Sequence, residues 1–207
     1  MSAPGRILIV CAIERELAGF AVPEAVDLLA CGVGPVDAAV AVARALAGGA
    51  YRAVISAGIG GVYEGRGAVG DAVAVIDERL ADFGLEGGAP LALPDGHALA
   101  ERVAAAPELV RLARHAGLRL ARGLTVTLVT TTEATARARR DRYGVDVESM
   151  EGFAVLRAAA LAGVPAIELR GISNVARERT LAGWNFSAGA QATLSALRTL
   201  VPSLLPR

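Results

Sequence analysis

The sequence contains no lysine, so all 21 of its basic residues are arginine. This absence excludes mechanisms that need a lysine amine, including Schiff-base catalysis and the P-loop that holds nucleotide phosphates. The 21 acidic residues balance the arginines, and the formal net charge is +0. The charge balance therefore gives no electrostatic reason to expect nucleic acid or an anionic membrane as a partner. Long hydrophobic runs are also missing, and none is long enough to predict a membrane span.

Cysteine and histidine are scarce, with two of each in the chain. Cys11 and Cys31 lie in apolar runs and match no metal or redox spacing, so we expect small core residues in a reducing cytoplasm. His97 and His115 lack the neighbours that a catalytic triad or a zinc site needs. The sequence therefore predicts no metal site. Its first residues are typical of a strand rather than of a signal peptide.

What is present is an alternation of short β-branched runs with stretches rich in Ala, Leu and Arg, which predicts an α/β fold with helices on both sides of a sheet. Strands are expected at Ile7–Ile13, Asp27–Cys31, Ala53–Ala57, Ala72–Ile76, Leu124–Val129, Asp146–Glu148 and Ala166–Arg170. Helices are expected at Pro35–Ala47, Pro107–Ala116, Glu133–Tyr143, Glu151–Ala162 and Ser187–Leu200. Gly84–His97, rich in Gly and Pro, is predicted to be a long surface loop. No domain boundary is visible, so residues 1–207 are predicted to form a single domain.

Two glycine-rich stretches are candidates for a dinucleotide site. GVGPVDAA has Asp37 where the third glycine of that fingerprint belongs, and SAGIGGVYEGRG is not followed by a helical pattern. Because the pyrophosphate needs a helix N-terminus, no dinucleotide cofactor is predicted. Gly58–Gly61 could instead let the backbone approach a ligand or form a tight turn, and both interpretations stay open.

Polar residues follow three of the predicted strands. Glu14 comes directly after the first strand, Glu151 opens a helix, and Ser173–Asn174 ends the last strand run. Taken singly, each has an ordinary explanation: a solvated turn, a carboxylate at a helix N-terminus, and a turn or cap residue. Ligands of open α/β sheets bind at the carboxyl ends of strands, so the three together favour a binding site.

Four segments between Ile7 and Asn174 resemble the nucleoside phosphorylase/nucleosidase superfamily, and the resemblance extends over nearly the whole chain. They are ILIVCAIERELAGF, ACGVGPVDAAVAV, VISAGIGGVYEGRGAVGDAVAVIDE and DVESMEGFAVLRAAALAGVPAIELRGISN. Within it, ADFGLE, ESMEG and ISNVARERTLAGWNF are most similar to the futalosine hydrolase branch, nucleosidases of an alternative menaquinone pathway. The resemblance implies a twisted, mixed, partly barrel-like sheet and a homodimer or higher homo-oligomer in the cytoplasm.

The resemblance also implies a role for each residue that matches a family motif. The glutamate matching Glu14 holds and activates water, and the one matching Glu151 binds the ribose hydroxyls. Met150 packs beside the ribose, and Ser173 orients Asn174. The implied reaction is hydrolysis of a small-molecule purine nucleoside, futalosine, to hypoxanthine and dehypoxanthinyl futalosine, with neither metal nor cofactor.

The amide at position 174 bears on the purine. The methylthioadenosine branch has an Asp there that acts as general acid at purine N7, and adenine needs that proton in order to leave. An amide donates hydrogen bonds without becoming charged, and a 6-oxopurine can place the departing charge on O6. Asn174 therefore favours hypoxanthine over adenine as the leaving base.

Futalosine also carries a carboxylated aromatic group beyond the 5′ carbon, and a carboxylate in a cleft is well matched by an arginine. Arg177 and Arg179 are candidates for that contact, although solvation on a helix surface is the favoured outcome for either one. Trp184 either shields the site or packs against the last helix.

Three other functions stay open. A 5′-methylthioadenosine/S-adenosylhomocysteine nucleosidase would release adenine. A purine nucleoside phosphorylase would require phosphate, which the charge of Glu14 would repel. A non-catalytic nucleoside-binding protein would bind without turnover.

Overall fold

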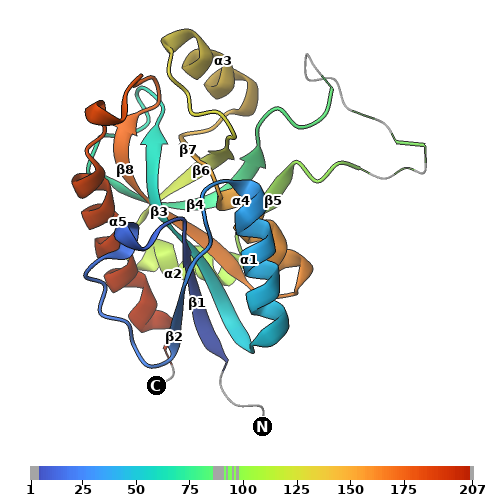
Figure 1. Cartoon of the computed structure of the whole chain (residues 1–207), viewed down its shortest axis with the longest axis vertical. Coiled ribbons are helices and arrows are strands. Elements are labelled where there is room, and N and C mark those ends of the chain that lie inside the picture. The colour runs from blue at the N-terminus through green and yellow to red at the C-terminus, as the bar shows by residue number, and fades with distance from the viewer. Residues whose placement is uncertain (1–4, 86–90, 92, 95, 97, 206–207) are drawn as a thin grey trace.

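The computed structural model describes residues 5–85, 91, 93–94, 96 and 98–205 (Figure 1). Its strands are β1 Arg6–Cys11, β2 Val26–Ala30, β3 Tyr51–Val62, β4 Ala72–Leu80, β5 Arg102–Ala104, β6 Arg119–Thr125, β7 Val147–Ser149 and β8 Ala166–Val175. Its α-helices are α1 Pro35–Gly48, α2 Pro107–His115, α3 Glu133–Tyr143, α4 Gly152–Leu161 and α5 Phe186–Leu200. Short 3₁₀ helices cover Glu14–Leu17 (η1), Leu181–Gly183 (η3) and Val201–Leu204 (η4).

The eight strands of the described residues form one mixed sheet that closes on itself. β3 pairs with β8, β8 with β4, β4 with β6, β6 with β7, and β7 with β3. β1 and β2 extend this ring from the first half of β3, and β5 pairs with the last residues of β4. The predicted mixed, partly barrel-like sheet is confirmed.

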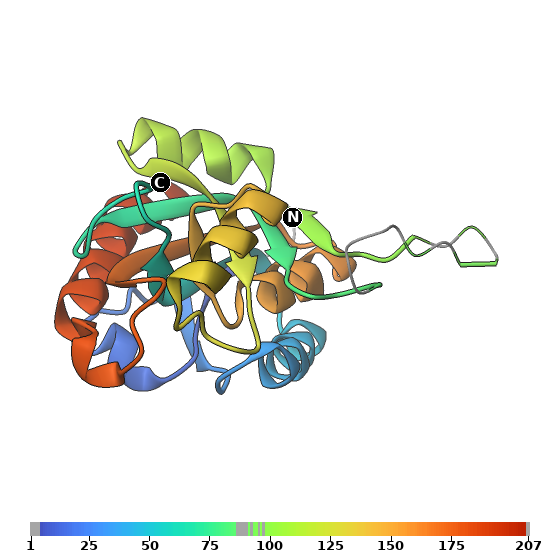
Figure 2. The same ribbon diagram turned by 90° about the horizontal axis from the view of Figure 1, so that it is seen from above.

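Helices cover the sheet on both sides, as predicted (Figure 2). On one side α1 packs against α4, over buried residues of β1 and β3 such as Leu8 and Val54. Elsewhere α5 lies along β8 and β3, with Leu197 and Leu200 in a core cluster shared with Ile55. Cys11 and Cys31 are free and buried, which confirms them as core residues. No helix of the described residues is both long and apolar enough to cross a bilayer.

Several strand boundaries differ from the sequence prediction. β3 was expected to end at Ala57 because Gly58–Gly61 is typical of a turn, but it continues to Val62. These positions lie within the ring, where neighbouring strands approach so closely that a side chain would not fit. An added Cβ at Gly60, for example, would lie 2.9 Å from the Glu148 carbonyl oxygen. β6 precedes its predicted range of Leu124–Val129 almost entirely, and the short β5 was not predicted.

The predicted helices are present with small shifts at their ends, and α3 matches its predicted range Glu133–Tyr143. The residues that start and stop this helix lie at its ends in the sequence. The Thr132 hydroxyl accepts a hydrogen bond from the Thr135 N–H at the start, and Gly144, with a φ of 64°, ends the helix. In the predicted loop Gly84–His97, residues 86–90, 92, 95 and 97 lie outside the described residues, and the others form no regular element.

Candidate active site

A cavity of about 610 Å³ opens where β1, β3, β7 and β8 end. Its polar lining comes from Arg15, Glu16, Glu148, Ser149, Glu151 and Asn174. Its apolar lining comes from Ala12, Ile13, Val33, Ile59, Gly60, Gly61, Val126, Val129, Met150, Leu181, Trp184 and Phe186. A mostly apolar cavity of this size with a few convergent polar groups is typical of a small-molecule site.

Glu16 is a buried carboxylate on η1 that lines this cavity. Its Oε2 accepts hydrogen bonds from the Ala12 and Ile13 N–H groups at 2.9 and 3.2 Å, and its Oε1 accepts from the Ile59 N–H at 2.9 Å. An added Cβ at Gly58 would lie 2.5 Å from Glu16 Oε1, so the glycine leaves room for the carboxylate. Backbone donors from two chain segments thus fix Glu16 in a single orientation.

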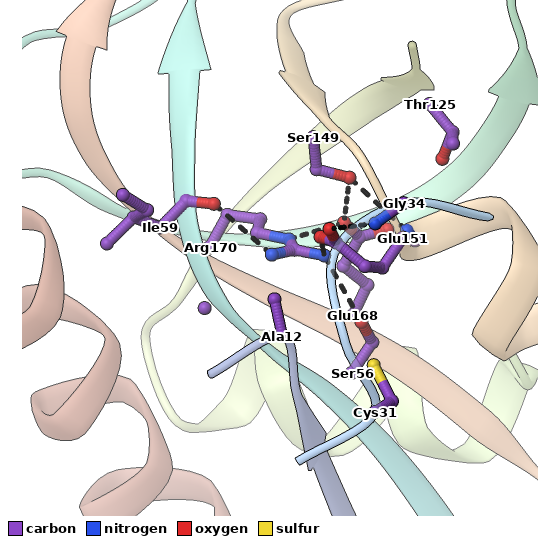
Figure 3. A network of polar contacts seen from close by, with 12 residues as sticks. Ala12, Cys31, Gly34, Ser56, Ile59, Thr125, Ser149, Glu151, Glu168 and Arg170 are labelled. Atoms are coloured by element: carbon purple, nitrogen blue, oxygen red, sulfur yellow. Dashed lines mark hydrogen bonds and ion pairs between the residues drawn. The ribbon is translucent and has the colours of Figure 1, made fainter. Parts of the chain in front are cut away.

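Glu151 also lines the cavity and is held by a second set of contacts (Figure 3). Its Oε1 accepts from the Gly34 N–H at 3.0 Å, and its Oε2 lies 3.5 Å from the Arg170 Nη2. Burial raises the pKa of Glu151, opposed by the charge of Arg170 and by the Gly34 N–H. Both oxygens are fixed, and each retains capacity to accept another hydrogen bond.

Arg170 is the buried cation at the centre of this network. Its Nε donates to Glu168 Oε1 at 2.7 Å, and the Ser149 hydroxyl donates to the same oxygen at 3.1 Å. Burial disfavours the charged guanidinium, but Glu168, Glu151 and Glu16 outweigh it and raise the pKa of Arg170. The arginine therefore stays charged and anchors the carboxylates on either side of it.

Asn174 presents its amide to the cavity from β8. The Ser173 hydroxyl donates to Asn174 Oδ1 at 2.8 Å, and one hydrogen of Nδ2 is directed to the Val175 carbonyl at 3.1 Å. The second hydrogen of Nδ2 is left for a ligand. An added Cβ at Gly61 would contact both Asn174 Nδ2 and the side chain of Glu148, so these two polar groups are neighbours.

Glu148 is buried and its carboxylate already accepts three hydrogen bonds. The donors are the Tyr63 hydroxyl at 2.8 Å, the Thr130 N–H at 3.0 Å and the Thr130 hydroxyl at 2.5 Å. The two oxygens of a carboxylate can accept about four hydrogen bonds, so one position remains.

Four residues that the sequence analysis selected do line the cavity: Met150, Glu151, Asn174 and Trp184. Glu14 does not, and the structure corrects the expectation that it shares a cavity with Glu151 and Asn174. Glu14 is exposed at the start of η1, while Glu16, two residues later, folds back onto the backbone donors that follow β1. The 3₁₀ turn directs the two carboxylates differently.

The remaining selected residues also lie outside the cavity lining. Ser173 is fully buried and reaches the site through Asn174, as the resemblance implied. Gly58 contributes space instead of a ligand contact. Arg177 is exposed, and its Nη1 donates to Glu64 Oε1 at 3.1 Å. It borders a separate crevice of only about 20 Å³. Arg179 is exposed to solvent.

Three charged cavity residues were missed: Arg15, Glu16 and Glu148. Arg15 and Glu16 stood in the same ERE triplet as Glu14, and no local pattern distinguishes which of the three faces inward. Glu148 is buried in a strand of three residues, β7, where the alternation of faces is too short to be informative.

The family model described as the phosphorylase superfamily matches residues 24–202. The sequence is 40% identical over 191 residues to futalosine hydrolase from Streptomyces coelicolor, covering 88% of this chain and 81% of that protein.

Two solved structures share the fold at low sequence identity. Futalosine hydrolase from Helicobacter pylori superposes with a TM-score of 0.84 at 18% identity, covering 97% of this chain and 98% of that one. S-adenosylhomocysteine nucleosidase from Streptococcus pyogenes, in complex with 5-methylthiotubericidin, gives a TM-score of 0.84 at 20% identity, covering 100% and 99%. The structural likeness alone thus does not distinguish these two activities.

Proposed function

The chain belongs to the phosphorylase superfamily and to the futalosine hydrolases within it, and from that premise we propose that it hydrolyses the N-glycosidic bond of futalosine. The products are hypoxanthine and dehypoxanthinyl futalosine. The observation that carries this proposal is a single cavity lined by a neutral amide, Asn174, and two separately held carboxylates, Glu16 and Glu151.

The two carboxylates act on the ribose and on the attacking water. Cleavage of a purine nucleoside passes through an oxocarbenium-like sugar, which nearby negative charge stabilises. Glu151 accepts from the ribose hydroxyls while the Gly34 N–H and Arg170 hold it in place. Glu16, fixed by three backbone N–H groups, takes a proton from water as the oxygen bonds to C1′ and the bond from C1′ to N9 breaks. The electron pair of that bond leaves with the base, and the hypoxanthine anion then takes up a proton from solvent water. Met150 packs against the ribose.

The departing base needs donors that do not add negative charge. In hypoxanthine O6 accepts hydrogen bonds and the adjacent N1–H donates one. The free hydrogen of Asn174 Nδ2 serves the acceptors N7 and O6, and the remaining position on Glu148 accepts from N1–H. This donor and acceptor pair complements a 6-oxopurine and supports hypoxanthine as the leaving base.

Water is favoured over phosphate as the acceptor. Among the described residues lining the cavity, the charged groups are three carboxylates and one arginine, Arg15. Arg170 lies beneath the lining and is engaged by Glu168 and Glu151. A phosphate beside Glu16 would meet negative charge without the arginines that usually compensate it.

The domain organisation, the metabolic role and location, and the oligomeric state of the protein are also proposals. We propose one domain over residues 1–207, a place in menaquinone synthesis in the cytoplasm, and a homodimer or higher homo-oligomer. The oligomer is supported by exposed valines at and just before the start of α1: Val36 and Val40 on the helix and Val33 before it are 72%, 55% and 56% exposed. Light scattering of the purified protein tests it, with a monomeric mass as the contrary result.

The proposed reaction is tested by incubating the protein with futalosine, inosine and methylthioadenosine, each with and without phosphate. Hypoxanthine released from futalosine at the same rate in both buffers is the expected result. Adenine release from methylthioadenosine as the fastest reaction would instead identify the nucleosidase that the Streptococcus pyogenes structure represents. Phosphate-dependent release would identify a phosphorylase, and tight binding without turnover would identify a binding protein.

A further inference from the structure

We propose that Arg15 binds a carboxylate at the end of the substrate's 5′ substituent, which makes nucleosides with an anionic aromatic arm the preferred substrates. This inference rests on the proposed function and deepens it. It assigns the contact that the sequence analysis had sought in Arg177 and Arg179, both of which lie outside the cavity lining.

The first support is the distribution of charge. Arg15 has an exposed side chain, but it is the one cation among the described residues that line the cavity, and it forms no ion pair with a described residue. The carboxylates Glu148 and Glu151 and the amide of Asn174 are committed to the base and the ribose. By elimination, the part of the cavity near Arg15 receives the substituent at the 5′ carbon. An arginine fork in a cleft is the natural partner of a carboxylate.

The second support is the apolar surroundings of this arginine. The guanidinium carbon of Arg15 lies 4.9 Å from the centre of the Phe186 ring, a stacked cation–π arrangement that holds the side chain over the cavity wall. Trp184, Leu181 and Ile13 complete this end, and Leu181 is 76% exposed. An aromatic ring bound here would cover apolar surface that is otherwise open to water.

The third support is an unused donor. Trp184 Nε1 is buried and has no hydrogen-bond acceptor among the described residues. A buried N–H without a partner is costly, and Trp184 lines the same end of the cavity as Arg15. An oxygen of the bound arm, reached by a small movement of η3 and the indole, would satisfy this donor. Charge, apolar surface and a free donor therefore all describe an aromatic carboxylate.

The size of the cavity agrees with such a substrate. Its volume of about 610 Å³ falls in the middle of the range of roughly 300–1,000 Å³ that holds drug-sized ligands. Glu16 and Arg15 are consecutive residues of η1, so one short element serves both the reacting sugar and the end of the arm.

The test compares futalosine with inosine, which lacks the arm, for the wild type and for Arg15→Gln. We expect KM for futalosine to rise about tenfold or more, with kcat within about twofold and kcat/KM for inosine unchanged. Arg15→Lys should recover part of the loss, because it restores the charge without the fork. Arg177→Gln, a similar change outside the cavity, is the matched control and should behave like the wild type.

A futalosine analogue with a carboxamide in place of the carboxylate isolates the charge. The wild type should bind it about as weakly as Arg15→Gln binds futalosine, and Arg15→Gln should not distinguish the two ligands. Equal KM values for futalosine in Arg15→Gln and the wild type, or a loss in Arg177→Gln instead, would overturn the inference. If the wild type does not cleave futalosine, the proposed function fails. Calorimetric affinities for the same ligands and variants then decide the role of Arg15 separately.

Discussion

At the scale of single residues, the structure separates two glutamates that the sequence presents together. Glu16 lines the cavity and is fixed by three backbone donors, whereas Glu14 is exposed. We therefore expect Glu16→Gln to lower kcat for futalosine by about 10² or more, since an amide cannot take the proton from water. Glu14→Gln is the matched control and should retain nearly full activity.

Both variants should melt close to the wild type, so that a loss of activity is not a loss of folding. A Glu16→Gln enzyme with near-normal kcat would remove Glu16 from the activation of water, and a large loss in Glu14→Gln would return that role to the exposed residue.

Asn174 gives a second prediction at this scale. Asn174→Asp places negative charge next to O6 of the departing 6-oxopurine, so hypoxanthine release from futalosine should fall by about 10². The same Asp, held by Ser173, could protonate an adenine at N7, so methylthioadenosine cleavage should rise relative to futalosine cleavage. The measurement is the ratio of the two kcat/KM values. An unchanged ratio contradicts the role given to the amide.

The sequence could predict those site residues whose position follows from an element boundary. Glu151 comes directly before α4 and Asn174 lies near the end of β8, so both follow from element boundaries. They meet in one cavity because the ring closes, since β7 pairs antiparallel and β8 parallel with β3. The sequence could not predict the choice within the ERE triplet, because this depends on hydrogen bonds from Ile59, which is 43 positions further along the chain. The same holds for Arg15, whose stacking partner Phe186 lies on another element.

At the scale of elements, helices were predicted better than strands because their caps and stops are local. α5 begins at Phe186 with Asn185 as its cap, whose side-chain oxygen accepts from the Ala188 N–H. β3 and β8 run further than predicted because their glycines and charged residues face other strands or α5 instead of solvent. Such contacts join distant segments, and no short window of sequence contains them.

The contact between α5 and β8 gives the prediction at this scale. A Cβ at Gly171 would collide with the Gly189 carbonyl oxygen and lie 2.7 Å from the Thr193 N–H, both backbone groups of α5. Gly171→Ala must therefore displace the helix, and we expect the free energy of unfolding to fall by about 1–3 kcal/mol or more. Gly48→Ala, at the last residue of α1 with open space around it, should be neutral or slightly stabilising.

Chemical denaturation of both alanine variants measures these changes. Because α5 also carries Phe186 into the cavity, Gly171→Ala should raise KM for futalosine as well. Equal stability of the two variants would mean that the helix can shift without cost and that the close packing has no energetic role.

At the scale of the whole molecule, the closed ring of strands encloses charged groups that an open sheet would expose. Glu78 on β4 and Glu168 on β8 are fully buried, and each has one carboxylate oxygen without a partner among the described residues. Sequence periodicity could not reveal this, because a charged residue in a strand normally marks the solvent face. Closure of the ring encloses one face of these strands, while helices such as α5 cover the other face, where Leu169 of β8 packs with Leu197.

Burial raises the pKa of Glu78 well above its ordinary value, and the charge of Glu168 adds to the effect, while the Thr125 hydroxyl and Arg170 oppose it. The native protein therefore keeps a proton on Glu78 over a pH range in which the unfolded chain has released it. Because the native state binds more protons, the free energy of unfolding falls as pH rises from about 4.5 toward the native pKa.

Glu78→Gln removes this dependence, because the amide mimics the protonated acid: it can accept from Thr125, donate to Glu168, and never titrates. We expect the variant to gain stability relative to the wild type as pH rises above about 4.5, by up to about 1.4 kcal/mol per pH unit until the native pKa of Glu78 is reached. Urea denaturation at several pH values measures the difference, with Glu108→Gln, an exposed carboxylate on α2, as control. If the free energy of unfolding of wild type and Glu78→Gln changed in parallel with pH, Glu78 would be ionised in the native protein. The closed ring would then hold two adjacent buried charges with Arg170 as their shared counterion.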